Sequence, residues 1–139
     1  MSETRLVFDQ KERVAAWTAE RAGHYGAWGD FYAMGAERDG ELICGLVFNG
    51  FPDTNVFLHF AFERPTKLLP ELILHAYVYA FGQIKRRRVT GFVEANKRKA
   101  LRVAKRLGFI EEGVMHQAGA NGEDILVLVL WPQNFRGRK

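Results

Sequence analysis

Apolar and polar positions alternate along this chain with two different periods, and the changes between them predict a mixed α/β fold. Over residues 55–62, Asn-Val-Phe-Leu-His-Phe-Ala-Phe, both sets of alternate positions are largely apolar, which is typical of a central strand. Over residues 68–81 the apolar positions return at steps of three and four, which predicts a helix. A strand at 88–94 and a helix ending at Gly108 repeat this order, so we expect helices on both faces of one sheet.

Turn signals define the remaining elements. Asp39-Gly40 separates apolar runs at 31–38 and 41–49, and this dipeptide favours a type I′ hairpin turn because both positions adopt positive φ. The other elements expected are a strand at 6–8, a helix over about 10–20 capped by Asp9, and a terminal hairpin formed by 114–117 with 125–131.

The composition is that of one globular domain. The chain has 139 residues, of which 47% are hydrophobic, enough to form a core. No apolar run approaches the ~18 residues of a membrane span, and no secretory signal is visible, so we expect a cytoplasmic protein. The single cysteine, Cys44, lies in an apolar run and is interpreted as a buried side chain rather than a nucleophile.

Positive charge is concentrated in one segment. Ten of the twenty lysines and arginines lie between Lys85 and Arg106, where Glu94 is the single acid. Such a field favours an anionic partner, and both the phosphates of coenzyme A and nucleic acid meet that description. A solvated outer helix face explains the same charges, so the sequence leaves these readings open.

The segment from Val89 to Gly113 is the most specific part of the chain. It reads Val-Thr-Gly-Phe-Val-Glu-Ala-Asn-Lys-Arg-Lys-Ala-Leu-Arg-Val-Ala-Lys-Arg-Leu-Gly-Phe-Ile-Glu-Glu-Gly and resembles the C-terminal half of GCN5-related N-acetyltransferases, the GNAT superfamily. The resemblance implies an α/β (α+β) fold with a mixed seven-stranded sheet, splayed between its fourth strand, 55–62, and its fifth, 88–93. We expect a single domain over 1–132 and a basic tail at 133–139.

The resemblance also indicates which residues meet acetyl-CoA, the expected donor. In this family the acyl thioester lies in the splay, and backbone groups near Ala61, Phe62 and Glu63 would hydrogen-bond the pantetheine arm. The family's glycine-rich pyrophosphate loop corresponds to Glu63-Arg-Pro-Thr-Lys-Leu-Leu-Pro70, which has no glycine, so side-chain charge from Arg64 and Lys67 replaces the backbone cradle or the site is lost. The expected cofactor-binding residues are Ala61, Phe62, Glu63, Arg64, Thr66 (as a helix cap), Lys67, Leu68 and Asn96 (as a helix cap or a cofactor contact).

Amine acylation needs a base that keeps the amine neutral, a polarised thioester carbonyl and a proton for the thiolate. His59 is the best candidate base because it lies in the fourth strand near the splay, although a structural histidine fits the same position. Glu63 acts directly or through water, or is an exposed strand end. Tyr32 and Tyr25 donate a proton or stack on a flat substrate, and His24 lies beside them. Aromatic rings packed in the core or at its rim need no such function, and this is the favoured interpretation of these residues. No Cys/His spacing indicates a metal site.

Within the superfamily, residues 36–49, the strand with His59 and the strand starting at Arg88 resemble small bacteriophage GNAT-like proteins. These include relatives of the Mom protein of phage Mu, which modifies adenine in DNA. Three functions stay open: an N-acyltransferase of unknown acceptor, a DNA-modifying phage enzyme, and a catalytically silent binding or virion protein. The last is favoured by Ala104, which stands where many members carry the tyrosine that protonates the thiolate. The partners expected are acyl-CoA, DNA through Lys85–Arg106, and a second copy in a homodimer, with no membrane; the compartment is the cytoplasm of a bacterium or a phage-infected host.

Overall fold

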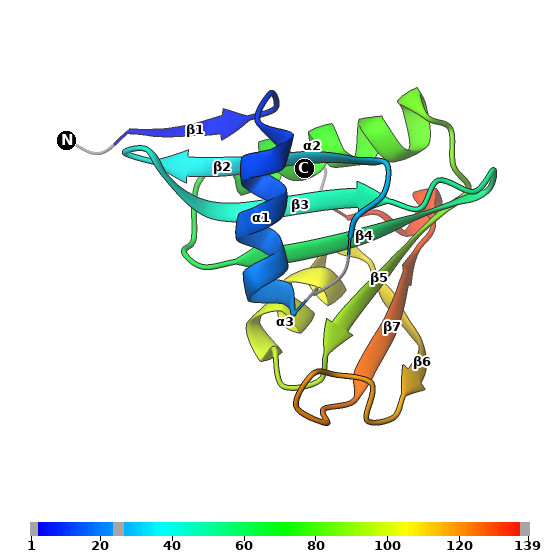
Figure 1. The fold of residues 1–139 in the computed structure, drawn as a ribbon. Helices are drawn as coiled ribbons and strands as arrows, with labels where there is room; N and C mark the ends of the chain where they lie inside the picture. The colour runs from blue at the N-terminus through cyan, green and yellow to red at the C-terminus, as the bar shows by residue number, and fades with distance from the viewer. Residues whose placement is uncertain (1–2, 24–26, 137–139) are drawn as a thin grey trace.

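One mixed sheet runs through the structure, a computed structural model that describes residues 3–23 and 27–136. Its strands follow the order β1-β2-β3-β4-β5-β7-β6, and within these residues β4 and β5 form the one parallel pair (Figure 1). His24 and Tyr25, two of the aromatic candidates, lie outside the described residues. The strands are β1 (Thr4–Val7), β2 (Phe31–Arg38), β3 (Glu41–Asn49), β4 (Asn55–Phe62), β5 (Arg88–Glu94), β6 (Ile110–Met115) and β7 (Ile125–Leu130).

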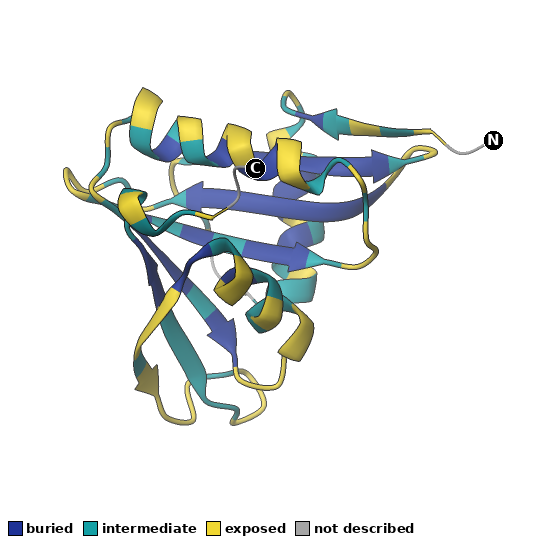
Figure 2. Cartoon of the chain, turned by 180° about the vertical axis from the view of Figure 1, so that it is seen from behind, coloured by how far each residue is buried: buried dark blue, intermediate teal, exposed yellow. Residues whose placement is uncertain are grey.

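Helices cover both faces of this sheet, which confirms the predicted architecture. α1 (Lys11–Ala22) packs across β2, β3 and β4 on the face that is in front in Figure 1. α2 (Leu69–Tyr77), which continues as a π-helical turn over Val78–Gln83, and α3 (Arg98–Leu107) lie on the other face (Figure 2). Among the described helices, none is both long and apolar enough to cross a bilayer.

Alternation along the central strands divides the core into two layers. In β4, Leu58 and Phe60 point toward α2 and α3 and belong to the larger apolar cluster. Val14, Ala33 and Val47 form part of a smaller cluster beneath α1. Both faces of the central strands are therefore buried, as their two-sided apolar pattern predicts, and Figure 2 shows this burial in β2 and β3.

The splay predicted between the fourth and fifth strands is present. β4 pairs with β5 only where Asn55–Leu58 faces Arg88–Gly91. Beyond that point β5 stays paired with β7 as far as Glu94, while β4 stays paired with β3 as far as Phe62, so the two strands separate (Figure 1). The facing edges over 59–62 and 92–94 are consequently without a neighbouring strand.

The helix caps predicted at Asp9 and Asn96 are wrong. Gln10 rather than Asp9 occupies the cap position of α1, and no side chain bonds the first turn. Lys97 rather than Asn96 precedes α3, because the Lys97 N–H donates to the Glu94 carbonyl at 2.9 Å and the backbone itself closes this turn. The side chain of Asn96 is exposed.

Both predicted hairpins form, although the strands of the terminal hairpin, expected at 114–117 and 125–131, are Ile110–Met115 and Ile125–Leu130. Asp39 and Gly40 have φ values of 51° and 85°, the signs that a type I′ turn requires. β6 begins at Ile110 rather than Val114, because a bulge between Glu111 and Gly113 lets the acidic turn continue within the edge strand.

The segment predicted to be a tail packs on the domain as far as Arg136. The Phe135 ring stacks on Tyr77 with centroids 4.3 Å apart. The Arg136 N–H donates to the carbonyl of Leu107 at 2.8 Å, so this segment is tied to both α2 and α3. The expected boundary at residue 132 does not account for these contacts.

Candidate functional site

The splay between β4 and β5 opens into a cleft of about 580 Å³, a volume in the range of small-molecule sites. Four segments form its walls: the C-terminal end of α1, the ends of β4 and β5, and the turn that leads into α3. They contribute residues 20–22, 60–63, 92–94 and 96–100.

Backbone groups of β4 face this cleft. The Glu63 N–H donates to the Ile43 carbonyl at 2.8 Å, so Glu63 and, by alternation, Ala61 direct their backbone groups toward β3. The same alternation turns the N–H and C=O of Phe60 and Phe62 toward the splay. Of the three residues predicted to hold the pantetheine arm, Phe62 alone presents backbone groups; Ala61 and Glu63 line the cleft with side chains. Phe60 was missed because the sequence does not show which neighbour each residue bonds.

The cleft has opposite charges on its two sides. The turn into α3 contributes Lys-Arg-Lys at 97–99, all exposed, at the positive end of the helix dipole. The end of α1 contributes Glu20, and the first residue after β4 is Glu63. Arg21 lies between these two carboxylates, at 3.2 Å from Glu20 and 3.3 Å from Glu63.

Glu94 is the most deeply buried charged side chain of the cleft, with 9% of it exposed. The Lys97 Nζ lies 4.0 Å from its Oε1 and is its counter-charge. It also reaches the end of α1, since a methyl group added to Gly23 would lie 2.9 Å from Glu94 Oε2. In the sequence Glu94 stands out only as the one acid of a basic segment. Its position at the end of β5, beside the splay, is the feature that could have indicated a place in the cleft.

The loop after β4 contributes little to the cleft. Glu63 lines it, whereas Arg64, Thr66, Lys67 and Leu68 do not. The Thr66 Oγ1 accepts a hydrogen bond from the Leu68 N–H at 3.1 Å and so stabilises the turn ahead of α2, rather than capping the helix as predicted. Of the predicted cofactor residues, the structure brings Ala61, Phe62, Glu63 and Asn96 together in the cleft.

His59 lies on the α1 face of β4, where the two strands begin to part. Its Nε2 is 3.1 Å from the Asn49 Oδ1, and the Asn49 Nδ2 donates to the Trp28 carbonyl at 3.2 Å. The His59 ring meets Trp28 edge-on at 4.9 Å and lies 6.3 Å from the ring of Phe92. Phe92 lines the cleft, whereas His59 itself does not. The candidate base is therefore held beside the deep end of the splay.

The structure does not bring Tyr32 together with His59. Tyr32 pairs with Phe48, which pairs with Leu58, and cross-strand partners share a face. Tyr32 thus faces α2, where its ring lies 4.7 Å from that of Tyr79, while His59 faces α1. Burial raises the pKa of the Tyr32 phenol, which makes it a weaker proton donor.

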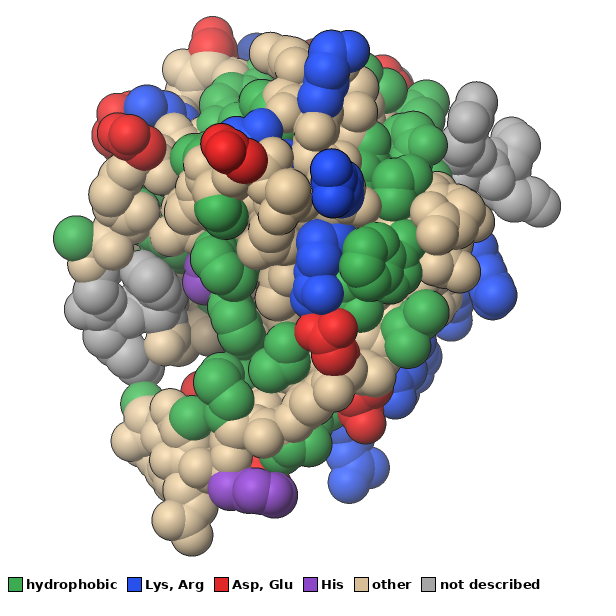
Figure 3. Space-filling model, turned by 90° about the vertical axis from the view of Figure 1, so that its right-hand side faces the viewer, with side chains coloured by type: hydrophobic (Ala, Val, Ile, Leu, Met, Phe, Trp, Pro, Cys, Tyr) green, Lys and Arg blue, Asp and Glu red, His purple; other side chains and the backbone are tan. Residues whose placement is uncertain are grey.

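The basic segment forms an exposed surface with few counter-charges. Three of its ten basic side chains lie within 4.0 Å of a carboxylate among the described residues: Arg88, Lys97 and Lys105. The closest of these pairs joins Arg88 to Glu112 at 2.7 Å. Figure 3 shows a column of lysine and arginine side chains on one face and more at its edge. We call Lys85–Arg88, Lys97 and the exposed side of α3 the basic surface.

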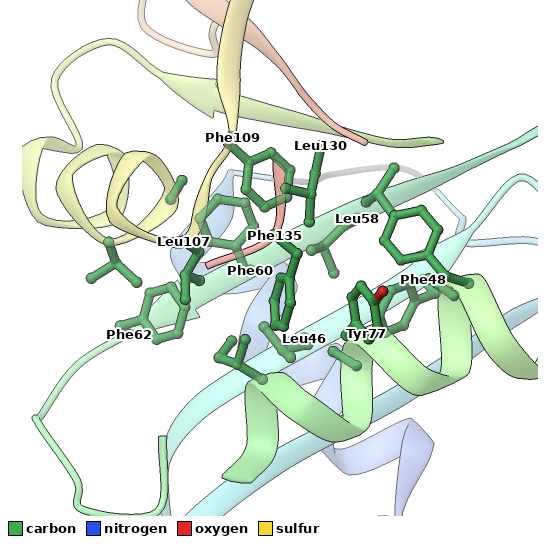
Figure 4. Close-up of a pocket in the computed structure, with 17 residues that line it drawn as sticks. Leu46, Phe48, Leu58, Phe60, Phe62, Tyr77, Leu107, Phe109, Leu130 and Phe135 are labelled. Atoms are coloured by element: carbon green, nitrogen blue, oxygen red, sulfur yellow. The ribbon is translucent and has the colours of Figure 1, made fainter. Parts of the chain in front are cut away.

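A second cavity lies between the sheet, α2 and α3, and its lining is entirely apolar (Figure 4). It measures about 40 Å³, and Tyr77 and Phe135 close one side. Phe60 and Phe62 separate it from the cleft, because they line both. Cys44 is buried nearby in the same apolar cluster, which confirms the interpretation of this residue, and burial raises the pKa of its thiol.

Over the described ranges, no group of three or more His, Cys, Asp or Glu side chains is placed to hold a metal ion.

Comparison with known proteins identifies the fold. No protein-family model matches the sequence, and no curated protein matches it. A solved structure described as a probable acetyltransferase superposes with a TM-score of 0.70 at 16% identity, over 96% of this chain and 94% of that one. A mutant form of SpeG, a spermidine N-acetyltransferase from Vibrio cholerae, gives a TM-score of 0.72 at 12% identity over 94% of both chains. A dodecameric structure of that enzyme gives 0.69, also at 12% identity over 94% of both chains.

These identities are low, so the likeness is one of fold. Together with the seven-stranded sheet and the splay after its one described parallel pair, it shows that this chain has the GNAT fold.

Proposed function

We propose that this protein is an acyl-CoA-dependent N-acyltransferase, with acetyl-CoA as the favoured donor. The observation that carries the proposal is the cleft of about 580 Å³ at the splay, into which Phe60 and Phe62 direct backbone groups. The pantetheine arm is flexible and carries amide groups. Backbone N–H and C=O groups at a strand edge can hydrogen-bond those amides and hold the arm in a fixed position. A cleft of this size accommodates the arm, and the fold of the neighbours supports the assignment.

The charges of the cleft suit an anionic donor. The first turn of α3 offers backbone N–H groups together with the basic side chains at 97–99, and a helix N-terminus of this kind favours phosphate. Arg64 and Lys67, exposed on the loop after β4, supply further positive charge outside the cleft. Side chains thereby replace the backbone cradle that a glycine-rich loop would form.

The chemistry needs one residue to move a proton twice. The acceptor nitrogen attacks the thioester carbonyl, the C–N bond forms as the C–S bond breaks, and the proton from the nitrogen passes to His59. His59 then returns it to the departing thiolate. This route replaces the tyrosine found in many members of the fold family, since Ala104 is buried against the core and carries no acid.

Release of free thiol from acetyl-CoA tests the proposal. The panel of acceptors includes spermidine, the substrate named for SpeG, along with simple amines, peptides and DNA. His59→Ala is expected to lower turnover by about 10²–10⁴ while acetyl-CoA binding stays unchanged. His116→Ala, with 78% of its side chain exposed, is the matched control and should leave turnover unchanged. Equal turnover in His59→Ala and the unsubstituted protein would remove His59 from the mechanism.

A second candidate, a Mom-like enzyme that modifies adenine in DNA with acetyl-CoA, is favoured by the basic surface. Seven of its ten basic residues have no carboxylate within 4.0 Å among the described residues. All of these except Arg86, which donates to the Ile84 carbonyl, are exposed and available to phosphates. The turn into α3, which is part of the basic surface, also borders the cleft. A duplex bound to that surface would therefore lie close to acetyl-CoA in the cleft.

Duplex DNA binding, measured by fluorescence anisotropy at several salt concentrations, tests this candidate. Arg102→Glu should weaken binding about tenfold and flatten the dependence on salt, because a phosphate contact is lost. Lys11→Glu makes the same change of charge on α1, across the sheet, and should have a much smaller effect. Absence of binding at low salt, or equal losses in both variants, would leave DNA out of the function.

A catalytically silent binding protein is the third candidate, favoured by the glycine-free loop and Ala104. Acetyl-CoA binding without thiol release for any acceptor in the panel would support it.

A further inference from the structure

The Asn49 side chain connects two parts of the candidate site. Asn49 ends β3, and Val47, its neighbour on the same face, pairs directly with His59 on β4. From this diagonal position the Asn49 Oδ1 lies 3.1 Å from the His59 Nε2. On its other side the Asn49 Nδ2 donates to the Trp28 carbonyl at 3.2 Å.

These two contacts define which nitrogen of His59 carries the proton. A carbonyl oxygen only accepts, so the contact with Trp28 must use the NH₂ group of Asn49. The Oδ1 of Asn49 is therefore the atom that faces His59, and it accepts a hydrogen bond from Nε2–H. In a neutral imidazole whose Nε2 is protonated, the lone pair that takes a proton is on Nδ1.

We propose that Asn49 is a positioning residue that holds His59 in the Nε2–H tautomer, the form in which the lone pair able to take a proton is on Nδ1. For the use of that lone pair in catalysis, the inference rests on the proposed function. The tautomer itself does not depend on it, because it follows from the two contacts of the Asn49 amide.

The surroundings of the ring support a single orientation. Trp28 packs edge-on against His59 at 4.9 Å, and Phe92 lies 6.3 Å away on the side of β5. Phe92 in turn stacks on Phe57 at 5.5 Å, so the wall on that side is itself packed. A ring confined in this way keeps the same nitrogen directed at Asn49. The amide thus selects the tautomer while the aromatic neighbours confine the ring.

The same amide ties the segment after α1 to the base. Its bond to the Trp28 carbonyl holds Trp28 against the end of β3, beside His59 on β4. Loss of Asn49 therefore removes both the hydrogen-bond acceptor for His59 Nε2–H and the donor that holds the Trp28 carbonyl. Two substitutions distinguish these effects. Asn49→Asp keeps an acceptor for the histidine and loses the donor to Trp28, whereas Asn49→Leu loses both.

Long-range nitrogen–proton NMR spectra of the histidine rings, recorded above the histidine pKa, test the inference without any need for turnover. The chain has four histidines, and the His59 signals are those missing from His59→Gln. We expect the Nε2–H pattern in the unsubstituted protein and in Asn49→Asp, and a mixture of tautomers in Asn49→Leu. An Nδ1–H pattern in the unsubstituted protein, or an Asn49→Leu spectrum identical to it, would overturn the inference.

The outcome is distinguishable from failure of the proposed function. Acetyl-CoA that neither binds nor releases thiol contradicts the acyltransferase, whatever the tautomer is. If turnover is found, Asn49→Leu should lower kcat by about tenfold or more with little change in the KM for acetyl-CoA, and Asn49→Asp should recover part of the loss. An unchanged kcat in Asn49→Leu would remove the positioning role even if the tautomer is as stated.

Discussion

The rings of Tyr77 and Phe135 stack at 4.3 Å and close the apolar cavity between α2 and α3. The contact joins the end of α2 to Phe135, and Figure 4 shows the Phe135 ring beside Tyr77 among the side chains that line the cavity. Phe135 therefore packs against the core, and loss of its ring should destabilise the domain.

Phe135→Ala should lower the free energy of unfolding by about 2–4 kcal/mol, less than a fully buried phenylalanine because this ring is partly exposed. Urea unfolding followed by circular dichroism measures the change. Gln133→Ala, an exposed position in the same segment, is the control and should change stability by less than ~0.5 kcal/mol. Equal stabilities of the two variants would mean that the segment does not contribute to the core.

Filling the apolar cavity should have the opposite effect. Val103 lines the cavity from α3. The cavity measures about 40 Å³, which leaves room for one methylene group. Val103→Ile adds that group without changing the β-branched character of the side chain, so we expect a gain of about 0.5–1 kcal/mol. A loss of stability in urea unfolding would indicate that the neighbouring side chains already fill this space.

Glu37 should make stability depend on pH. It is 4% exposed, and hydrogen bonds from Arg13 at 2.7 Å and Arg5 at 2.6 Å lower the pKa of its carboxyl group, the bond from Arg13 first. A carboxyl group whose pKa is lower in the folded state stabilises the fold above its unfolded pKa, about 4.3, and this contribution is lost as pH falls through the folded pKa.

Glu37→Gln should accordingly lower the free energy of unfolding by about 1–3 kcal/mol at pH 7, and the difference should shrink as the pH falls below about 4. Urea unfolding at a series of pH values measures it. Glu41→Gln, at an exposed position on β3, should give a small and nearly constant difference. A Glu37→Gln difference that grows on acidification would contradict the assignment.

Alanine substitutions at Gly23 and Gly29 should distinguish the cost of backbone strain from the cost of a steric clash in the cleft. Both have positive φ, 77° and 68°, but an added methyl group meets Glu94 at 2.9 Å only at Gly23 and meets nothing within 4 Å at Gly29. Each Gly→Ala substitution should cost about 1 kcal/mol from the backbone, and Gly23→Ala should cost more. Equal costs in urea unfolding would mean that Glu94 moves freely away from the end of α1.

The main strands were predictable from the sequence because their information is local. The alternation over 55–62 and the Asp39-Gly40 turn predicted β2, β3 and β4 with the bounds observed. The helix caps were not, because Asn96 competes with a turn that the backbone closes between Lys97 and Glu94. The packing of Phe135 depends on Tyr77, which is distant in sequence, and no periodicity reports such a contact.

The candidate site was predictable in part, for a related reason. The position of the splay followed from the family resemblance, and His59 and Phe62 border it. The face of the sheet on which Tyr32 lies depends on register, which relates it to Phe48 and Leu58 rather than to His59. Burial of Glu94 requires the end of α1 to lie against β5, a contact between segments that the sequence does not place side by side.

Titration calorimetry of the purified protein with acetyl-CoA, at low and at moderate salt, tests whether this cleft binds the donor. We expect a Kd of the order of micromolar that persists at moderate salt, because backbone groups of β4 hold the arm and only the phosphates depend on the charges at 97–99. Absence of heat in both buffers would contradict this expectation and leave the GNAT fold of this chain as a scaffold without the donor.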